Sequence, residues 1–237
     1  QRVSGAGCTS TELFTKAFET ALADPAVRSI VIDVDSPGGA VAGTPELADR
    51  IHAGRSRKPI VAVANATAAS AAYWIACAAS EVVCTPSGMV GSIGVLAVHE
   101  DRSKALRARG VAFSLIHAGR FKVEGNSMSP LGADARSEMQ RTVDQAYMRM
   151  TTAIGRYRGR SAAEVAAQFG QGRMLDARAA LRAGMVDRVA TLDDTILRMS
   201  GARPLAVVTG GARAAHPPRR AAAAARLMLV QRPKLIR

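Results

Sequence analysis

Two short runs of mostly apolar residues constrain the fold of this chain more than any other feature. Residues 28–35 (RSIVIDVD) and 59–65 (PIVAVAN) are rich in β-branched residues and place apolar side chains at consecutive positions. This pattern is typical of strands that are buried on both faces of a parallel sheet. Segments with helical character follow them, at 41–55 and 67–80. Because strands alternate with helices, the sequence predicts an α/β domain with mostly parallel strands.

The alternation of strands and helices continues to about residue 200. Short apolar runs predict further strands at 81–85, 93–99, 111–117 and 185–189. The remaining helices are expected at 10–23, 101–109, 132–168, 176–184 and 192–200. In the long region 132–168, apolar residues recur at helical spacing and predict a helix with one buried side. The members of this stripe are Met139, Val143, Ala146, Tyr147, Met150 and Ile154.

Positive charge is concentrated at the C-terminal end. Eight of the 32 Lys and Arg residues lie in residues 201–237, which contain no Asp or Glu. For a chain of 237 residues we therefore expect one domain, residues 1–200, followed by a basic tail rich in Ala, Arg and Pro, residues 201–237. Such a tail buries little surface, so we expect it to be disordered or loosely helical.

The charge of this tail suits a nucleic acid, an acidic partner or an anionic surface. The tail lacks interleaved aromatic residues on which bases stack. We therefore predict no specific nucleic-acid partner, and a solvated tail without a specific partner is the simplest interpretation.

Composition excludes several other classes of protein. The chain has no run of about 18 apolar residues, so we expect no segment that spans a bilayer. Its three cysteines, Cys8, Cys77 and Cys84, have no metal-ligand spacing, which argues against a disulfide framework or a zinc site and fits a reducing compartment. The chain begins with Gln1 rather than Met, so we expect residues to precede it.

The first segment that could take part in binding or catalysis is the turn Asp35-Ser36-Pro37-Gly38-Gly39, which follows the first buried strand. Glycines allow a sharp turn whose bare backbone N–H groups face outward. Such donors suit an oxyanion or the backbone of an extended peptide. By itself, however, Ser-Pro-Gly-Gly is also the sequence of an ordinary turn.

The second segment is residues 65–76 (NATAASAAYWIA), in which Ser70 lies among small residues where a strand gives way to a helix. A serine there can present its hydroxyl to a cleft. The Ala71 N–H and the helix dipole would then stabilise developing negative charge. The alternative is that Ser70 only caps the helix.

A nucleophilic serine needs a base. His99 and His117 each end an expected strand, and either could serve. The other possibility is a lysine whose amine desolvation keeps neutral. Lys122 is the best candidate because it lies in a Gly-bounded loop, residues 117–130, directly after an expected strand. Its amine would have to stay clear of Glu124.

Taken together, these segments resemble serine peptidases of the signal peptide peptidase A type, which have the ClpP/crotonase fold. The resemblance covers roughly residues 10–195. It rests on IVIDVDSPGG (30–39), Ala-Ala-Ser (68–70), VGSIGV (90–95), Lys122 and DARAALRAGMVDRV (176–189). It implies a ClpP/crotonase-like repeated ββα spiral that commonly assembles into homo-oligomeric rings.

The resemblance also implies roles for individual residues. Ser70 would be the nucleophile and Lys122 the general base of a Ser/Lys dyad, with Ser92 orienting the lysine amine. The oxyanion donors would be the Gly38–Gly39 turn and the Ala71 N–H. No metal and no organic cofactor is implied.

One departure narrows the resemblance. Membrane-bound members usually carry Ser-Gly-Gly-Tyr-Tyr at the nucleophile, whereas this chain has Ser-Ala-Ala-Tyr-Trp (70–74). With Lys-Val-Glu-Gly-Asn (122–126), this variant is similar to the phage head protease branch, the minor-capsid-protein-C type. Those enzymes cleave scaffold and capsid proteins inside a prohead.

We therefore expect a serine endopeptidase that acts on scaffold or capsid proteins in the bacterial cytoplasm or the phage prohead. One alternative is a membrane-associated peptidase that degrades cleaved signal peptides, which would need an upstream anchor. Another is an inactive structural member of the capsid or scaffold. A crotonase-like acyl-CoA enzyme is the least favoured, because it has no use for a Ser/Lys pair.

Overall fold

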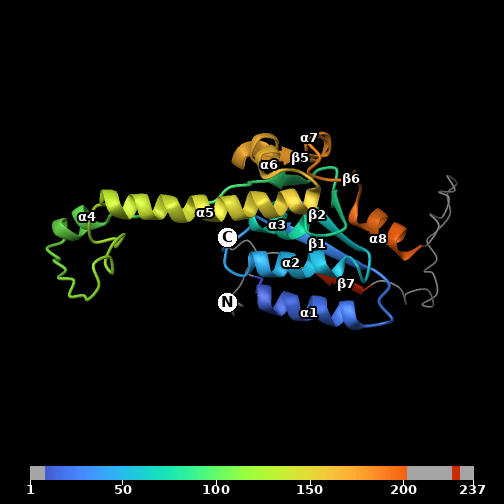
Figure 1. The fold of residues 1–237 in the computed structure, drawn as a ribbon, viewed down its shortest axis with the longest axis horizontal. Coiled ribbons are helices and arrows are strands. Elements are labelled where there is room, and N and C mark those ends of the chain that lie inside the picture. The colour runs from blue at the N-terminus through green and yellow to red at the C-terminus, as the bar shows by residue number, and fades with distance from the viewer. Residues whose placement is uncertain (1–8, 202–225, 230–237) are drawn as a thin grey trace, which may run out of the picture. The chain divides into compact units, whose positions relative to one another are not determined.

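The chain forms a mixed α/β structure around a mostly parallel sheet (Figure 1). The computed structural model describes residues 9–201 and 226–229. The chain divides into two units. The first comprises Gln1–Ile93 and Met150–Arg237, and the second comprises Gly94–Arg149. The sheet belongs to the first unit.

Within the described residues the sheet has seven strands, in the order β5-β4-β2-β1-β7, with β3 pairing to β2 and β6 to β3. All neighbouring strands are parallel except β4 and β5. The expected mostly parallel sheet is therefore confirmed. The strands are β1 (Ile30–Ser36), β2 (Ile60–Ala69), β3 (Glu81–Cys84), β4 (Met89–Gly91), β5 (Met174–Asp176), β6 (Arg188–Val189) and β7 (Arg226–Leu229).

Helices cover both faces of this sheet. On one face α1 (Thr11–Ala23) and α2 (Thr44–Gly54) meet β2, because a Cβ atom at Gly54 would lie 2.9 Å from Phe18 and 3.2 Å from Ile60. On the other face, α8 (Leu192–Ser200) packs its apolar side against a cluster of buried valines. These valines are Val31, Val61, Val63 and Val83. Both faces of the central strands are thus buried, as their continuous apolar runs predict.

Short helices surround the carboxyl-end edge of the sheet. α3 (Ala71–Ala76) follows β2 directly and packs on β1 and β2. α6 (Ala162–Gln168), a short 3-10 turn (Gly170–Gly172) and α7 (Ala177–Arg182) flank β5. The expected helix at 176–184 is therefore present, and Gly184 follows it with a φ of 74°, as a helix-terminating glycine does.

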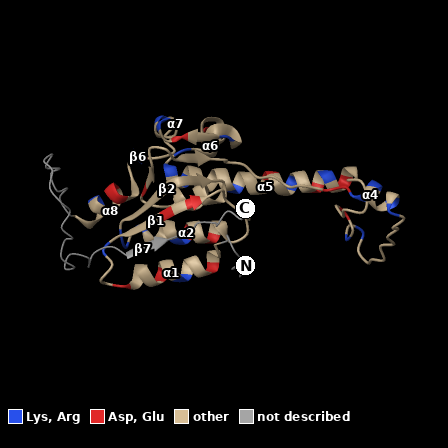
Figure 2. Cartoon of the chain, turned by 180° about the vertical axis from the view of Figure 1, so that it is seen from behind, with Lys and Arg blue, Asp and Glu red and all other residues tan. Residues whose placement is uncertain are grey.

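The second unit contains α4 (Ser103–Ala108) and most of α5 (Ala133–Arg158), whose residues from Met150 on belong to the first unit. The apolar stripe expected in region 132–168 is confirmed, because each of its members is buried or half-buried. Basic and acidic residues alternate along the exposed surface of α5 (Figure 2). The helix ends at Arg158, and α6 begins after Ser161, whose side chain caps it.

Two strand predictions are wrong. Residues 93–99 and 111–117 belong to no strand in the structure, although their composition favours one. A β-strand needs a neighbour for its backbone hydrogen bonds, and among the described residues neither segment has one. Ile93 is buried, at 2% exposed, and Val95 is half-buried. The other large apolar side chains of the two segments are open to solvent, with Leu96 80% and Ile116 98% exposed.

The predicted tail, residues 201–237, falls mostly outside the described residues. One part of it, Arg226–Leu229, is described as β7 and pairs in parallel with residues 30–33 of β1. For these four residues the expectation of a disordered or loosely helical tail is corrected. The edge of a buried parallel strand such as β1 needs a hydrogen-bonding neighbour, which explains the pairing.

Arg158 ties the end of α5 to the loop between α7 and β6. Its guanidinium donates to both carboxylate oxygens of Asp187, at 2.7 and 2.8 Å, and to the Gly184 carbonyl at 3.0 Å. Asp187 in turn accepts the backbone N–H of Val82 at 2.8 Å, which extends the link to β3. Partial burial alone would raise the pKa of Asp187, but these hydrogen bonds outweigh it and hold the pKa below its usual value.

We expect Arg158→Met to lower the free energy of unfolding by about 2–3 kcal/mol near neutral pH, because it leaves Asp187 without its cation. Since the folded-state pKa of Asp187 is depressed, its stabilisation is complete above the unfolded value, about 3.9, and is lost as the pH falls through the folded value. The difference between wild type and variant should therefore shrink below about pH 4.

Urea unfolding at pH 7 and pH 3.5 measures this difference. Arg141→Met is the matched control, because it removes an exposed ion pair to Glu138 on α5, and it should cost less than about 0.5 kcal/mol. Equal effects of the two substitutions would contradict the prediction.

Candidate active site

Ser70 occupies the junction between β2 and α3 in a strained backbone conformation. Its φ is 51° and its ψ is −122°, outside the regions that L-residues prefer. Although Ser70 stands at the N-cap position, its hydroxyl accepts no hydrogen bond from the helix. The capping interpretation of Ser70 is therefore not supported, and no hydrogen bond from the helix occupies the hydroxyl of this half-buried residue. Strain of this kind is characteristic of functional positions.

The Gly38 turn lies directly against Ser70. Gly38 has a φ of 105°, and a Cβ atom added there would lie 2.8 Å from the Ser70 Cβ and 2.9 Å from the Ala69 carbonyl oxygen. Only glycine leaves room for this approach. The structure thus brings together two segments, 36–39 and 69–71, that the sequence indicated separately.

The backbone donors expected for an oxyanion also lie around this contact. The Ala71 nitrogen would be 3.2 Å from a Cβ at Gly38. The Gly38 N–H donates to Ser36 Oγ at 3.2 Å. Gly39 is exposed, and a Cβ there would meet no atom within 4 Å. The N–H groups of Gly39 and Ala71 are therefore the donors best placed to receive a ligand.

Ser92 is the counterpart of Ser70 on the neighbouring strand. β2 and β4 pair in parallel with Ala69 opposite Gly91. Ser70 and Ser92 are therefore the residues that directly follow these two strands. The Ser70 N–H donates to the Gly91 carbonyl at 2.8 Å, and the Ser92 N–H donates to the Arg173 carbonyl at 3.0 Å. Ser92 also has a positive φ, 53°. The two hydroxyl-bearing residues therefore end adjacent strands at one edge of the sheet.

Lys122 belongs to the second unit, where it lies in a turn with its N–H donating to the Gly119 carbonyl at 3.2 Å. Its side chain is exposed, and within the described residues it forms no ion pair with Glu124. The structure describes Lys122 and Ser70 in separate units, so the pairing of the two stays a prediction.

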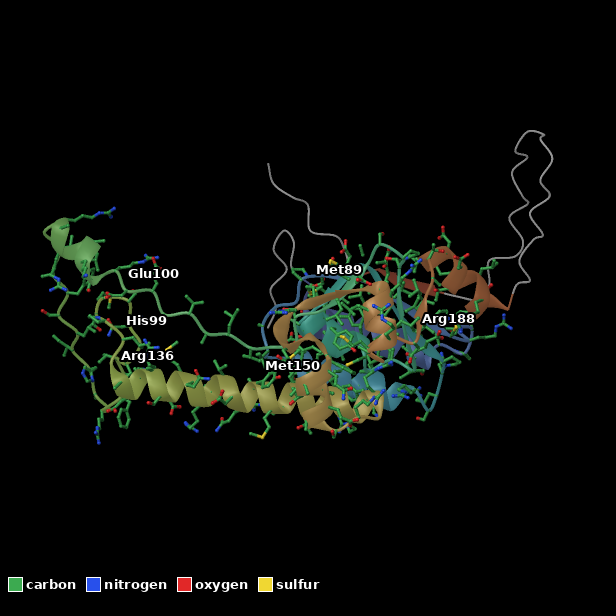
Figure 3. The ribbon with its side chains drawn as sticks, turned by 90° about the horizontal axis from the view of Figure 1, so that it is seen from above. Met89, His99, Glu100, Arg136, Met150 and Arg188 are labelled. Atoms are coloured by element: carbon green, nitrogen blue, oxygen red, sulfur yellow. The ribbon has the colours of Figure 1, made fainter. Side chains whose placement is uncertain are left out.

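The alternative bases, His99 and His117, also belong to the second unit. His99 Nε2 lies 3.0 Å from the Asn126 carbonyl oxygen, and His117 Nδ1 lies 3.1 Å from that of Gly119. Figure 3 shows His99 and Glu100 in the segment before α4. Each imidazole thus has a backbone partner of its own.

Lys58, in the first unit, is excluded as the base for Ser70. Its Nζ donates to the Ala21 and Asp24 carbonyls at 2.8 and 2.6 Å, at the end of α1. Lys58 precedes β2 and Ser70 follows it, so the length of that strand, roughly 30 Å, separates them.

Three polar residues beside this site have no role assigned by the sequence-based predictions. Asp33, Asp35 and Asn65 are half-buried where β1 and β2 approach Ser70. Asp33 Oδ1 accepts from Asn65 Nδ2 at 3.2 Å, and Asp35 Oδ1 accepts from the Thr67 N–H at 3.3 Å. Two acidic residues in an otherwise apolar strand were the signal that could have drawn attention to them.

Residues 9–201 and 226–229 contain no group of three or more His, Cys, Asp or Glu side chains that could hold a metal ion. Among the helices that the structure describes, none combines the length and the apolarity needed to cross a bilayer.

Comparison with known proteins identifies the family. The model of peptidase family S49 matches residues 52–205, which is more than half of the chain and includes Ser70, Ser92 and Lys122. The chain belongs to peptidase family S49.

Three relatives show the range of proteins that the chain resembles. It is 34% identical over 196 residues to the head-tail preconnector protein GP5 of Enterobacteria phage P21 (83% of this chain, 39% of that protein). It is 35% identical over 190 residues to the capsid assembly protease C of Escherichia phage lambda (78% and 42%). It is 27% identical over 190 residues to a putative signal peptide peptidase SppA of Enterococcus faecium (78% and 54%). The chain thus spans about two fifths of the length of the two phage relatives.

The close approach of Gly38 to Ser70 generates a prediction. Gly38→Ala should slow the reaction of Ser70 with a fluorophosphonate probe on the order of 10²-fold, because the new Cβ displaces the nucleophile segment. Gly132→Ala is the matched control, because a Cβ at Gly132 meets no atom within 4 Å and this residue lies outside the segments of the candidate site. It should react at nearly the wild-type rate. Intact-protein mass spectrometry over time measures the labelling rates of the two variants and the wild type. Equal rates for the two variants would show that the contact does not position Ser70.

Proposed function

We propose that this protein is a serine endopeptidase that uses a Ser/Lys dyad. The observation that carries the proposal is the placement of Ser70 against the Gly38 turn and beside the Ala71 N–H. Ser70 has a strained backbone there, and its hydroxyl does not cap the helix that follows. Membership of peptidase family S49 supports the same reaction class. The family's ClpP/crotonase-like spiral is proposed for the peptidase domain, residues 1–200, with residues 201–237 as its tail.

The proposed reaction begins with attack of Ser70 Oγ on a peptide carbonyl carbon. Lys122, in its neutral form, takes the hydroxyl proton as the new C–O bond forms. The N–H groups of Ala71 and of the Gly38–Gly39 turn stabilise the negative charge on the carbonyl oxygen. Lys122 then gives the proton to the leaving amine, which breaks the C–N bond and leaves an acyl-enzyme. Water hydrolyses this ester with Lys122 again as the base.

Ser92 is proposed to orient the Lys122 amine through its hydroxyl. Its position next to Ser70 across the β2–β4 pair supports this role, because a group that aligns the base must lie near the nucleophile. The conformation of Ser92, with a φ of 53°, suits a residue whose side chain is held for a function.

The proposed substrates are scaffold or capsid proteins during head assembly of a phage or prophage. The support is the similarity to a protein named capsid assembly protease C, which is stronger than the similarity to the putative signal peptide peptidase. A signal peptide peptidase is the second candidate. It is supported by the similarity to the putative signal peptide peptidase, which is weaker than the similarity to capsid assembly protease C. The site is proposed to need no metal or organic cofactor.

The dyad is tested by labelling with a fluorophosphonate probe followed by peptide mapping. We expect the wild-type chain to be labelled at Ser70. Ser70→Ala and Lys122→Ala should each lower labelling on the order of 10³-fold or more, because the two residues act as a unit. Lys104→Ala is the matched control, since Lys104 is an exposed lysine of the same unit.

Each result separates the candidate functions. Labelling that survives Lys122→Ala would contradict the dyad and make His99 or His117 the base to test. Absence of labelling in the wild type would support the third candidate, a structural member of the capsid that does not use the serine.

We also propose that the protein assembles into a homo-oligomer through the second unit. Residues 94–99 and 111–117 have the composition of strands but no strand neighbour within the described residues, and most of their apolar side chains are exposed. Leu96, Val98, Phe113 and Ile116 are 80, 79, 57 and 98% exposed. A second copy presents the same unpaired segments. Two copies can therefore supply each other with backbone hydrogen-bond partners and cover each other's apolar side chains.

Sedimentation velocity tests this assembly. The wild type should sediment as an oligomer, and the double substitution Leu96→Lys with Ile116→Lys should shift it to the monomer, because each lysine places a charge in the apolar contact. Leu13→Lys is the control, at a similarly exposed leucine of the first unit. A wild type that is monomeric at all concentrations would contradict the proposal.

A further inference from the structure

β1 and β2 lose their regular register just before the candidate active site. They pair residue by residue from Ile30 opposite Ile60 to Val34 opposite Ala64, and pair again where Ser36 stands opposite Ala68. Between these points β1 has one residue, Asp35, whereas β2 has three, residues 65–67. The extra residues form a bulge in β2, and bulges commonly re-aim a strand next to a functional site.

The bulge is where β2 changes its second neighbour. Residues 61–64 of β2 pair with β3, and residues 67–69 pair with β4. The second pairing continues into the hydrogen bond from the Ser70 N–H to the Gly91 carbonyl, 2.8 Å long. The position of Ser70 beside Gly91 and Ser92 therefore depends on the bulge.

Side chains of β1 hold the bulge on one side. The Thr67 N–H donates to Asp35 Oδ1 at 3.3 Å, so this carboxylate replaces the ladder partner that the bulge removes. Asn65 Nδ2 donates to Asp33 Oδ1 at 3.2 Å and ties the start of the bulge to the same strand. A backbone N–H near the interior that lost such an acceptor would be costly.

The opposite side of the bulge is held by the loop between β3 and β4. Thr85 donates both its N–H and its hydroxyl to the Ala64 carbonyl, at 3.0 and 3.1 Å. Gly88 approaches the Ala66 carbonyl oxygen so closely that a Cβ atom would lie 2.8 Å from it. The bulge is therefore clamped between two elements, with Asp35 as the acceptor for Thr67 on the β1 side.

We propose that Asp35 is a positioning residue for the nucleophile. It stands immediately before Ser36, which begins the turn that contacts Ser70, and its carboxylate holds the segment that leads to Ser70. A single side chain thus couples the oxyanion turn to the nucleophile and sets their separation. This inference rests on the proposed role of Ser70.

The proposed role requires a hydrogen-bond acceptor at residue 35 and not a negative charge. Asp35→Ala removes the acceptor, whereas Asp35→Asn keeps Oδ1 in place and removes only the charge. The pair of variants therefore separates positioning of the backbone from an electrostatic effect on a catalytic base.

The experiment measures the rate constant for fluorophosphonate labelling of Ser70 in the full chain, together with the fraction labelled at completion and the melting temperature. Asp35→Ala should slow labelling on the order of 10²-fold while the final labelled fraction stays that of the wild type. Asp35→Asn should react within about fivefold of the wild type. Asp193→Ala, at an exposed position on α8, is the control for loss of an acidic residue.

A merely structural role would lower the fraction that becomes labelled and leave the rate constant of the folded molecules unchanged. That result, or a rate for Asp35→Asn as low as for Asp35→Ala, would overturn the inference. If Asp35→Ala does not fold, Asn65→Ala takes its place, because it loosens the other tie to the bulge and should slow labelling about tenfold. A wild-type rate for Asn65→Ala would then overturn the inference. Absence of labelling in the wild type would overturn the proposed nucleophile and this inference with it.

Discussion

The change of neighbour along β2 is the constraint on which the candidate active site depends. A strand that stayed paired with β3 to its end would carry Ser70 away from Gly91 and Ser92. Because β2 bulges after Ala64 and continues beside β4, its last residue stands opposite Gly91 and Ser70 follows at the edge of the sheet. The Gly38 turn reaches this edge from β1, which is parallel to β2, so the two turns meet without any long loop.

The local chemistry of the site follows from small residues. Gly38 permits contact with the Ser70 segment, and the alanines on both sides of Ser70 allow the backbones to come close. The cost is strain, since Ser70 and Ser92 both have positive φ values. Such strain persists only where surrounding contacts over-determine the backbone. Here those contacts are the β2–β4 pairing, the hydrogen bond from Ser92 N–H to Arg173 and the ties from Asp33 and Asp35.

The structure distributes the predicted residues between two units in a way that composition does not reveal. Ser70, Ser92, Gly38, Gly39 and Ala71 all belong to the unit that contains the sheet, whereas Lys122 belongs to residues 94–149. In the second unit, two segments of strand-like composition keep most of their apolar side chains exposed. The same physical fact, that a strand is stable only with a neighbour, explains both the failed strand predictions there and the proposed assembly of copies.

Residue types alone predicted the mostly parallel α/β sheet and pointed to the candidate nucleophile and oxyanion segments. Strands buried on both faces must be apolar throughout, and a turn that touches another backbone must use glycine, so both features are visible in residue types. The three-dimensional arrangement was needed to show that β2 runs on to Ala69, that α3 is confined to Ala71–Ala76, and that Asp33 and Asp35 contact the bulge. These features depend on which strand lies beside which. Hydrogen bonds between residues more than 30 positions apart leave no periodicity in the sequence that could reveal them.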